Sequence, residues 1–153
     1  MDKQIDYINR FSEAFSLMIV KMQEVDNFCV SMTHDISKQD LVLIGYVGTL
    51  NNVIMRDVAN YLDVPYSTAT GIVDKLVQKD YLKRYNSETD RRTVLVCLTE
   101  GKGKATFEFF NSKKNEMSAR IMSVLEPGEQ TQLITLIEKV TDAFTSQELT
   151  TEP

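Results

Sequence analysis

Residues 55–98 read MRDVANYLDVPYSTATGIVDKLVQKDYLKRYNSETDRRTVLVCL, and this stretch decides the fold. Its first part predicts a short helix over 56–62, which Asp63-Val64-Pro65 ends because the residue before a proline disfavours the helical conformation. A second helix is expected from Tyr66 or Ser67 to about Lys79, with one apolar side. Two short helices joined by three or four residues form a helix-turn-helix unit.

After Asp80 the pattern changes from helical to extended. Segments 81–85 and 93–98 are rich in β-forming residues, and the polar segment 86–92 joins them as a hairpin loop. In a helix-turn-helix the second helix enters the major groove of DNA, and free N–H groups at its start can bind a phosphate. Adjacent arginines at the hairpin tip, Arg91 and Arg92, suit the narrow minor groove of A·T-rich DNA.

A long amphipathic helix is expected before this unit. From Asp2 to Met32 the apolar residues recur every three or four positions, which marks one helical face. About 30 residues span ~45 Å, which is more than a domain of this size can cover. Part of the apolar face therefore needs another partner, most simply a second copy of the chain.

The remaining segments are predicted from their start signals. Ser37 and Asp40 form a capping-box pattern before a helix that runs to Leu50, and Val53-Ile54 are expected as a very short strand. Another long helix is expected to begin after Thr99 and to run to about Val124. The last helix begins at 126–129 and carries an apolar stripe, and the tail 145–153 is expected to fray. The stripe consists of Leu133, Ile134, Leu136, Ile137, Val140 and Phe144.

Composition and charge narrow the class of protein. The chain has 153 residues, 42% hydrophobic and 25% charged, which fits one domain with helical extensions. With neither a signal-peptide pattern nor an apolar run of ~20 residues, we expect a soluble cytoplasmic protein. The net charge is −5, but residues 65–104 hold eight basic and five acidic residues, a surplus of +3. This asymmetry favours one face that meets an anionic partner.

Five short motifs follow one another between Ile36 and the last helix. They are Ile36-Ser37, Val58-Ala59, Val73-Asp74-Lys75-Leu76, Asp90-Arg91-Arg92 and Leu98-Thr99-Glu100-Gly101-Lys102-Gly103. In these motifs the chain resembles the MarR (multiple antibiotic resistance regulator) family, and their order and spacing are the specific part of the resemblance.

The resemblance implies a mainly α (α+β) fold, a winged helix-turn-helix with long N- and C-terminal dimerisation helices. Residues 1–35 and 100–147 would form the helical dimerisation region, and residues 36–99 the DNA-binding region. The implied function is a homodimeric transcription regulator, most simply a repressor of pseudo-palindromic operator DNA, in a bacterial or archaeal nucleoid. It would bind double-stranded DNA, need no cofactor, and have no membrane partner.

The resemblance also implies which residues meet DNA. Ser67, Thr68 and Thr70 would contact the groove and phosphates, Asp90 would pair with an arginine to stiffen the wing, and Arg92 with Arg91 would enter the minor groove. The full set of expected DNA-binding residues is Tyr66, Ser67, Thr68, Thr70, Gly71, Lys75, Asp90, Arg91 and Arg92.

Several positions depart from the family pattern. Gly71 stands where many members carry a long basic or polar side chain, and Met55 stands where a Thr or Ser usually caps the third helix. Pro65 and Tyr66 replace the usual capping Ser and Lys. These departures shift the expected DNA affinity toward Tyr66 and the wing.

Other candidate sites each have a plainer alternative. Phe15, Met18 and Met22 could line a groove between dimer helices for a small aromatic or lipophilic effector, or could simply be core residues at helical spacing. Cys29 is a redox candidate, but a buried thiol beside Asp26 is the simpler interpretation. Cys97 lies in an apolar strand, and His34 has no clustered ligands for a metal.

The DNA-binding residues have alternatives too. The basic residues Lys75, Lys79, Lys83 and Arg84 could form an ordinary solvated face. Ser67, Thr68 and Thr70 could serve only as helix-start residues. A second class of function keeps the fold but drops the specificity, as a low-specificity DNA-binding or protein-interaction module. No nucleophile–base pair, phosphate loop or metal cluster is recognisable by spacing, so we predict no enzyme.

Overall fold

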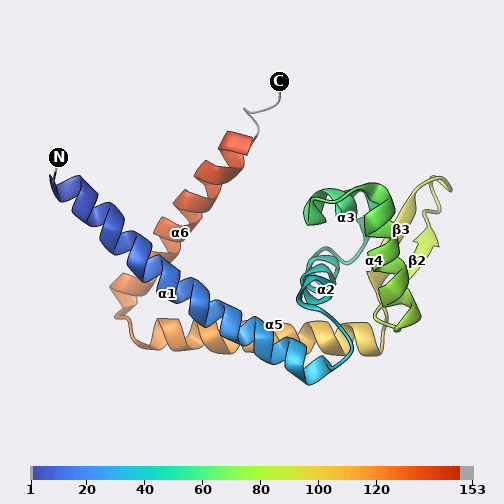
Figure 1. The fold of residues 1–153 in the computed structure, drawn as a ribbon, viewed down its shortest axis with the longest axis horizontal. Coiled ribbons are helices and arrows are strands. Elements are labelled where there is room, and N and C mark those ends of the chain that lie inside the picture. Colours follow the sequence, from blue (N-terminus) through green and yellow to red (C-terminus); the bar gives the residue numbers. More distant parts are fainter. Residues whose placement is uncertain (1, 149–153) are drawn as a thin grey trace. The chain divides into compact units, whose positions relative to one another are not determined.

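A computed structural model describes residues 2–148, and its side chains from 3 to 144 (Figure 1). The elements, in chain order, are α1 (Asp2–Thr33), α2 (Lys38–Leu50), β1 (Val53–Ile54), α3 (Met55–Leu62), α4 (Tyr66–Gln78), β2 (Leu82–Asn86), β3 (Val94–Leu98), α5 (Lys102–Ser123) and α6 (Pro127–Glu148). The predicted mainly α class with a small sheet is confirmed. The chain divides within α5, after Lys114, into two compact units.

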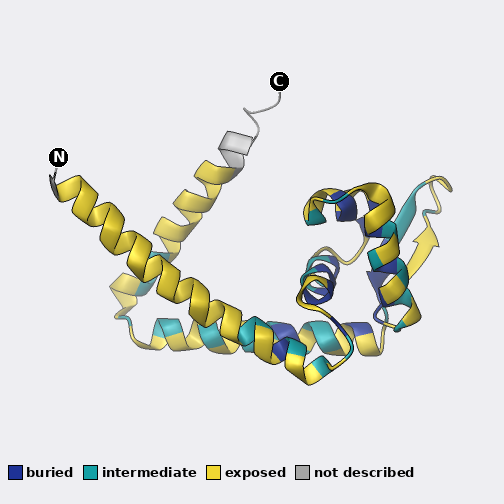
Figure 2. Cartoon of the chain, viewed as in Figure 1, coloured by how far each residue is buried: buried dark blue, intermediate teal, exposed yellow. Residues whose placement is uncertain are grey.

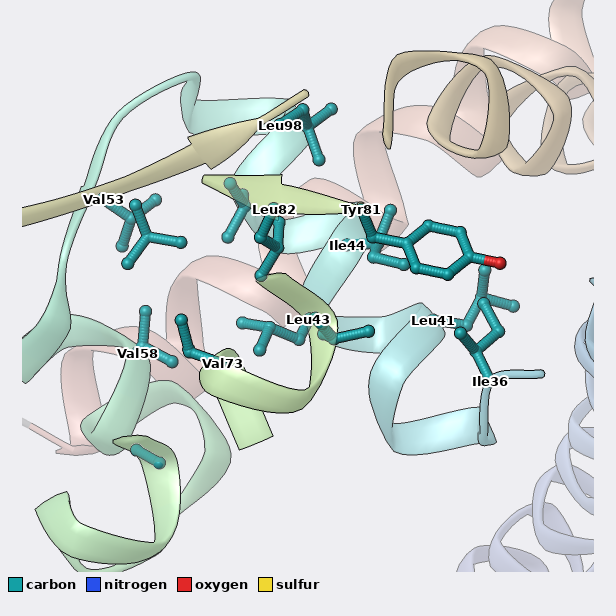
Figure 3. Close-up of a cluster of buried hydrophobic side chains, with 14 of the residues drawn as sticks. Ile36, Leu41, Leu43, Ile44, Val53, Val58, Val73, Tyr81, Leu82 and Leu98 are labelled. Atoms are coloured by element: carbon teal, nitrogen blue, oxygen red, sulfur yellow. The ribbon is translucent and has the colours of Figure 1, made fainter. Parts of the chain in front are cut away.

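The core of the first unit lies where α2, α3, α4 and the strands meet (Figure 3). The helices bury the faces that their sequence patterns predict, with Val58 from α3 and Val73 from α4 fully buried beside Leu43 of α2. Tyr81 and Leu82, at the entry to the hairpin, are each 1% exposed. The hairpin therefore starts inside the core rather than on its surface.

The sheet is antiparallel with strand order β1-β3-β2, so β3 is central. Val96 of β3 lies opposite Val53 on one side and Arg84 on the other. The very short strand predicted at Val53-Ile54 is confirmed. By pairing with β3, it ties the segment before α3 to the hairpin.

The cap of α3 differs from the expectation for Met55. Ile54 occupies the N-cap and makes no side-chain bond, and Met55 is the first helical residue, 2% exposed in the core. An apolar residue at this position contributes buried surface in place of a capping hydrogen bond. Pro65 at the N-cap of α4 likewise makes no side-chain capping bond.

The end of α4 is fastened to the start of α5. The Tyr81 N–H donates to the Leu76 carbonyl, and the Asp80 N–H donates to that of Val77, which closes the helix with Asp80 in the left-handed conformation at φ 61°. Thr99 bridges onward, because its hydroxyl donates to the Asp80 carbonyl at 2.7 Å and accepts the Gly103 N–H at 2.8 Å.

The start of α2 is built around a buried carboxylate. Asp40, 2% exposed, accepts the Ser37 N–H at 2.8 Å, and its own N–H donates to the Ser37 hydroxyl, which confirms the predicted capping box. The Lys75 ammonium of α4 lies 2.5 Å from Asp40 Oδ2. Burial raises the pKa of Asp40, but the bonds from Lys75 and Ser37 outweigh burial and hold that pKa below its ordinary value.

The long helices α1 and α6 expose most of their apolar residues (Figure 2). α1 has 32 residues, or ~48 Å at 1.5 Å per residue. α6 continues to Glu148, beyond the predicted start of fraying at 145, and residues 149–153 lie outside the described part. None of the helices in the described residues is long and apolar enough to cross a membrane.

Gly103 generates the first prediction. A Cβ at this position would overlap the Tyr81 carbonyl oxygen and lie 2.9 Å from Thr99 Oγ1, whereas a Cβ on Gly101 would meet nothing within 4 Å. Because a backbone carbonyl cannot rotate away, Gly103→Ala should lower the free energy of unfolding by about 2 kcal/mol. Urea denaturation at fixed protein concentration measures this, and a Gly101→Ala loss of equal size would contradict it.

Asp40 generates a pH-dependent prediction. Its pKa is lower in the folded protein than in the unfolded chain, so its stabilisation is present above pH ~4 and is lost as the pH falls through the folded pKa. Asp40→Asn should cost about 1.5–3 kcal/mol at pH 7, and much less near pH 3. Urea denaturation across this range tests it. Asp6→Asn, which breaks the exposed pair with Arg10, should change little at any pH.

Candidate nucleic-acid interface

The turn between α3 and α4 is short and well defined. Asp63 adopts the left-handed conformation at φ 50°, and the N–H groups of Asp63 and Val64 donate to the Asn60 and Ala59 carbonyls. Pro65 follows at once as the N-cap of α4, and the helix begins at Tyr66, one of the two starts that the sequence predicts. The two helices bury their facing sides, which leaves the start of α4 at the surface.

The exposed start of α4 carries small polar side chains. Tyr66 is 54% exposed, Ser67 and Thr68 are exposed, and Thr70 is half-buried. The Thr70 hydroxyl donates to the Tyr66 carbonyl at 2.9 Å, so its oxygen can still accept a bond. A Cβ on Gly71 would meet nothing within 4 Å. This surface is therefore open enough for another backbone to approach closely.

A shallow depression separates the start of α4 from the hairpin, which forms the wing. Tyr66 and Thr70 line it from α4, and Arg84, Tyr85, Asn86 and Val94 line it from the wing, with Met55 at its base. An extended polar chain with negative charge would meet aromatic, hydroxyl, amide and guanidinium groups there. Of the predicted site residues, Tyr66 and Thr70 thus line this depression, and Ser67, Thr68 and Gly71 are exposed in the same first half of α4.

The wing is held against α4 by an ion pair that the sequence analysis did not predict. Arg84 of β2 makes an ion pair with Asp74 of α4 at 2.7 Å. On the other face of the sheet, the Tyr85 hydroxyl donates to Asn52 Oδ1 at 2.6 Å. The Asp74 within the V-D-x-L motif was the available signal, but its partner on another element becomes visible only in three dimensions.

The loop at the wing tip is ordered by Asp90, although not by the predicted arginine side chain. Asp90 accepts the backbone N–H of Arg92 at 3.0 Å and the Thr93 hydroxyl at 2.8 Å, and these two bonds lower the pKa of Asp90. Asn86 adds a bond to the Arg91 carbonyl at 2.9 Å. The expectation of an Asp90–arginine pair is therefore corrected. The turn is held through the backbone, and Arg91 and Arg92 lie exposed.

Lys75 lies apart from the other predicted DNA-binding residues. Its ammonium pairs with the buried Asp40, and the neighbouring Lys79 ammonium donates to the Asp35 carbonyl. The reason is the packing of the second half of α4, which lies against the corner between α1 and α2. Both lysines thus make contacts within the protein at this place, and the binding of DNA by Lys75 stays a prediction.

The remaining candidate residues do not join this surface. Cys29 is fully buried, and its thiol pKa is raised by burial first and by Asp26 second, with Lys113 opposing. Burial likewise raises the pKa of Cys97. Phe15, Met18 and Met22 are exposed along α1. Within residues 2–148 no group of three His, Cys, Asp or Glu side chains could hold a metal ion.

The comparisons with known proteins agree with this geometry. A sequence profile of the MarR family matches residues 34–93. The HTH-type transcriptional regulator BilQ of Clostridium symbiosum is 30% identical over 136 residues, which cover 88% of this chain and 87% of BilQ. FabT of Streptococcus pneumoniae, solved in complex with DNA, is similar with a TM-score of 0.71 at 25% identity, over 94% of this chain and 96% of FabT.

A further structure, a MepR mutant of S. aureus, shares the fold with a TM-score of 0.72 at 22% identity, over 88% of this chain and 96% of MepR. At this level of identity the likeness concerns the fold alone.

Proposed function

The chain belongs to the MarR family, and from this premise we propose that it is a homodimeric, non-enzymatic regulator that represses transcription from pseudo-palindromic operator DNA. One observation carries the proposal: the start of α4 and the two arginines at the wing tip are all exposed, while the Arg84–Asp74 ion pair holds the wing against α4. The family supports transcription regulation, and the DNA complex of FabT supports duplex DNA as the partner.

In the proposed complex the start of α4 enters the major groove. Its Ser67 and Thr68 hydroxyls can donate to bases and phosphates, and Tyr66 adds a phenol at the edge of the surface. Gly71 leaves open space where a longer side chain would hold the helix away from the base edges. We therefore assign Tyr66, Ser67, Thr68, Thr70 and Gly71 to the major-groove contact.

The wing supplies the second contact. Arg91 and Arg92 are exposed on a turn whose shape is set by bonds from Asp90, Asn86 and Thr93, so little loop entropy remains to be lost on binding. A narrow minor groove concentrates negative potential, which favours an inserted guanidinium. Asp90 takes no DNA contact of its own in this proposal, because a carboxylate would be repelled by phosphates. Lys75 is likewise removed from the contact set, since its charge is matched by Asp40.

The proposed dimer is formed by the long helices. Apolar side chains on α1 and α6 are roughly half exposed in the single chain, such as Phe11 at 67% and Ile137 at 53%. On each helix, apolar side chains exposed in such number are rarely left to water in a soluble protein. A second copy would cover it and set two α4 helices about one DNA turn, ~34 Å, apart.

An effector can act on this spacing. Phe15, Met18 and Met22 project from α1 with 41–50% exposure, so they would line the dimer region next to any partner helix. A small aromatic or lipophilic molecule bound there would lower DNA affinity by as much as it prefers a dimer with the wrong spacing. This part of the proposal rests on the dimer.

Selection of duplexes from a random DNA library by the full chain tests the function as a whole. We expect a two-fold symmetric consensus, protected in footprinting, with a specific affinity far above that for unrelated duplex. Equal binding to selected and unrelated duplexes, with a steep salt dependence, would instead support the low-specificity module.

The wing assignment makes a sharper prediction. Arg92→Ala should weaken binding to the selected duplex by about 10- to 100-fold, because one inserted guanidinium is lost, while the dimer stays intact. Fluorescence anisotropy measures the affinity, and sedimentation measures the dimer. The matched control is Arg10→Ala, an exposed arginine on α1 paired with Asp6. Unchanged affinity of the Arg92 variant would refute the wing contact.

The dimer assignment is tested on α6. Ile137→Glu would place a charge in the proposed apolar interface, and the cost of burying it should raise the dimer dissociation constant by about 100-fold or more. Gln132→Glu adds the same charge at an exposed polar position of the same helix and should leave the dimer unchanged. Sedimentation at several protein concentrations separates the two. A wild-type-like dimer in the Ile137 variant would contradict the assignment.

A further inference from the structure

We propose that Asp35 is a positioning residue for DNA binding, because a junction of Asp35, Tyr81 and Lys102 fixes the end of α4 from which the exposed start of the helix projects. This inference rests on the proposed function and deepens it. The Asp35 carboxylate accepts the Tyr81 hydroxyl at 2.5 Å and the Lys102 ammonium at 2.8 Å, one on each oxygen.

The junction joins three separate segments of the first unit. Asp35 lies in the corner between α1 and α2, Tyr81 follows the end of α4, and Lys102 is the first residue of α5. Lys102 also reaches the Lys79 carbonyl at 3.3 Å, and its ammonium lies 4.1 Å from the centre of the Tyr81 ring. A movement of α1 or α5 against α4 must therefore break at least one of these bonds.

The surroundings of Tyr81 make the junction stiff. Its ring is 1% exposed and extends toward Leu41 and Ile36 (Figure 3). Its own N–H closes α4 on the Leu76 carbonyl, and its carbonyl accepts the Thr99 N–H. The hydroxyl that donates to Asp35 thus belongs, through a buried ring, to the residue whose N–H closes the C-terminal end of α4.

Because α4 is long, a small tilt at its C-terminal end produces a larger displacement at its N-terminal start. The helix has 13 residues, so it is about 18–20 Å long, and a tilt of about 3° at its end moves its start by about 1 Å. A misplacement of 1 Å is enough to spoil directed contacts. The start of α4 has no side-chain capping bond, and Ala69 is the buried residue of its first half, so the polar contacts that fix the helix lie at its other end.

Because Asp35 is negatively charged, its proposed positioning of α4 and its direct electrostatic effect on DNA affinity can be distinguished. A carboxylate next to a DNA-binding unit repels phosphates, so removing its charge should by itself tighten DNA binding. If Asp35 positions α4, removing the charge should weaken specific binding instead. The two effects have opposite signs.

The experiment uses the full chain, the selected duplex and an unrelated duplex of equal length. We expect Asp35→Asn to bind the selected duplex about fivefold or more weakly, within the usual range of coupling between sites. Its affinity for the unrelated duplex should be unchanged or higher. Tyr81→Phe, which deletes only the hydroxyl and alters no charge, should reduce the same specificity ratio in the same direction.

Glu100→Gln is the matched control. Glu100 also pairs with a lysine at the start of α5, Lys104 at 2.6 Å, but the pair is exposed and lies within one helical turn. Its removal should leave the specificity ratio at the wild-type value. Urea denaturation of each variant ensures that binding is compared where all the chains are folded.

The outcomes separate the two proposals. Wild-type or tighter binding of the selected duplex by Asp35→Asn overturns the positioning role. An equal loss on both duplexes also overturns it, because misplacement of α4 should affect only specific contacts. A wild-type chain that prefers no duplex would overturn the proposed function itself, whatever the variants do.

Discussion

The buried ring of Tyr81 is the connection on which the arrangement of the first unit depends. One residue ends α4 through its N–H, joins the wing to the start of α5 through its carbonyl, and reaches the α1–α2 corner through its hydroxyl. Gly103 must lack a side chain because this carbonyl occupies the space. A single side chain of this volume could not be moved without repacking, since interiors are close-packed. The helices that flank the unit and the helix that would meet DNA are thus parts of one frame.

Acidic residues of the first unit pair with several of its basic residues, so the net charge of a segment does not describe the charge that it presents to a partner. The surplus of basic residues between 65 and 104 includes several that are already matched, as Lys75 is by Asp40, Arg84 by Asp74 and Lys102 by Asp35. These cations stabilise the frame and contribute little field toward an anionic partner. The exposed basic residues outside these ion pairs include Lys83 and, at the wing tip, Arg91 and Arg92, which share their loop with Glu88 and Asp90.

The elements could be predicted from the sequence because each is encoded locally. The spacing of apolar residues predicts α1, Pro65 predicts the break before α4, and the Ser37–Asp40 capping box predicts the start of α2. The two-residue strand at Val53 was also within reach. The contacts between elements could not be predicted. Lys75, for example, would occupy the same position of α4 whether it contacts DNA or pairs with Asp40, so the sequence cannot distinguish the two roles. Asp90 shows the same limit, because its partner is a backbone N–H, which every sequence provides.

The unequal anchoring of α4 has a consequence for specificity. Its second half is held by polar contacts of Asp40 and Tyr81 and by the packing of Val73 and Leu76, whereas its first half packs through the small buried Ala69 and exposes small polar side chains. Short side chains such as Ser67 and Thr68 have little reach, so in the proposed complex they would contact base edges only if the helix backbone itself is placed accurately. Long, adaptable side chains at these positions would tolerate a less precise placement of the helix. The small residues at the start of α4 therefore require accurate placement of the helix, and the junction of Asp35, Tyr81 and Lys102 at its other end would supply that placement.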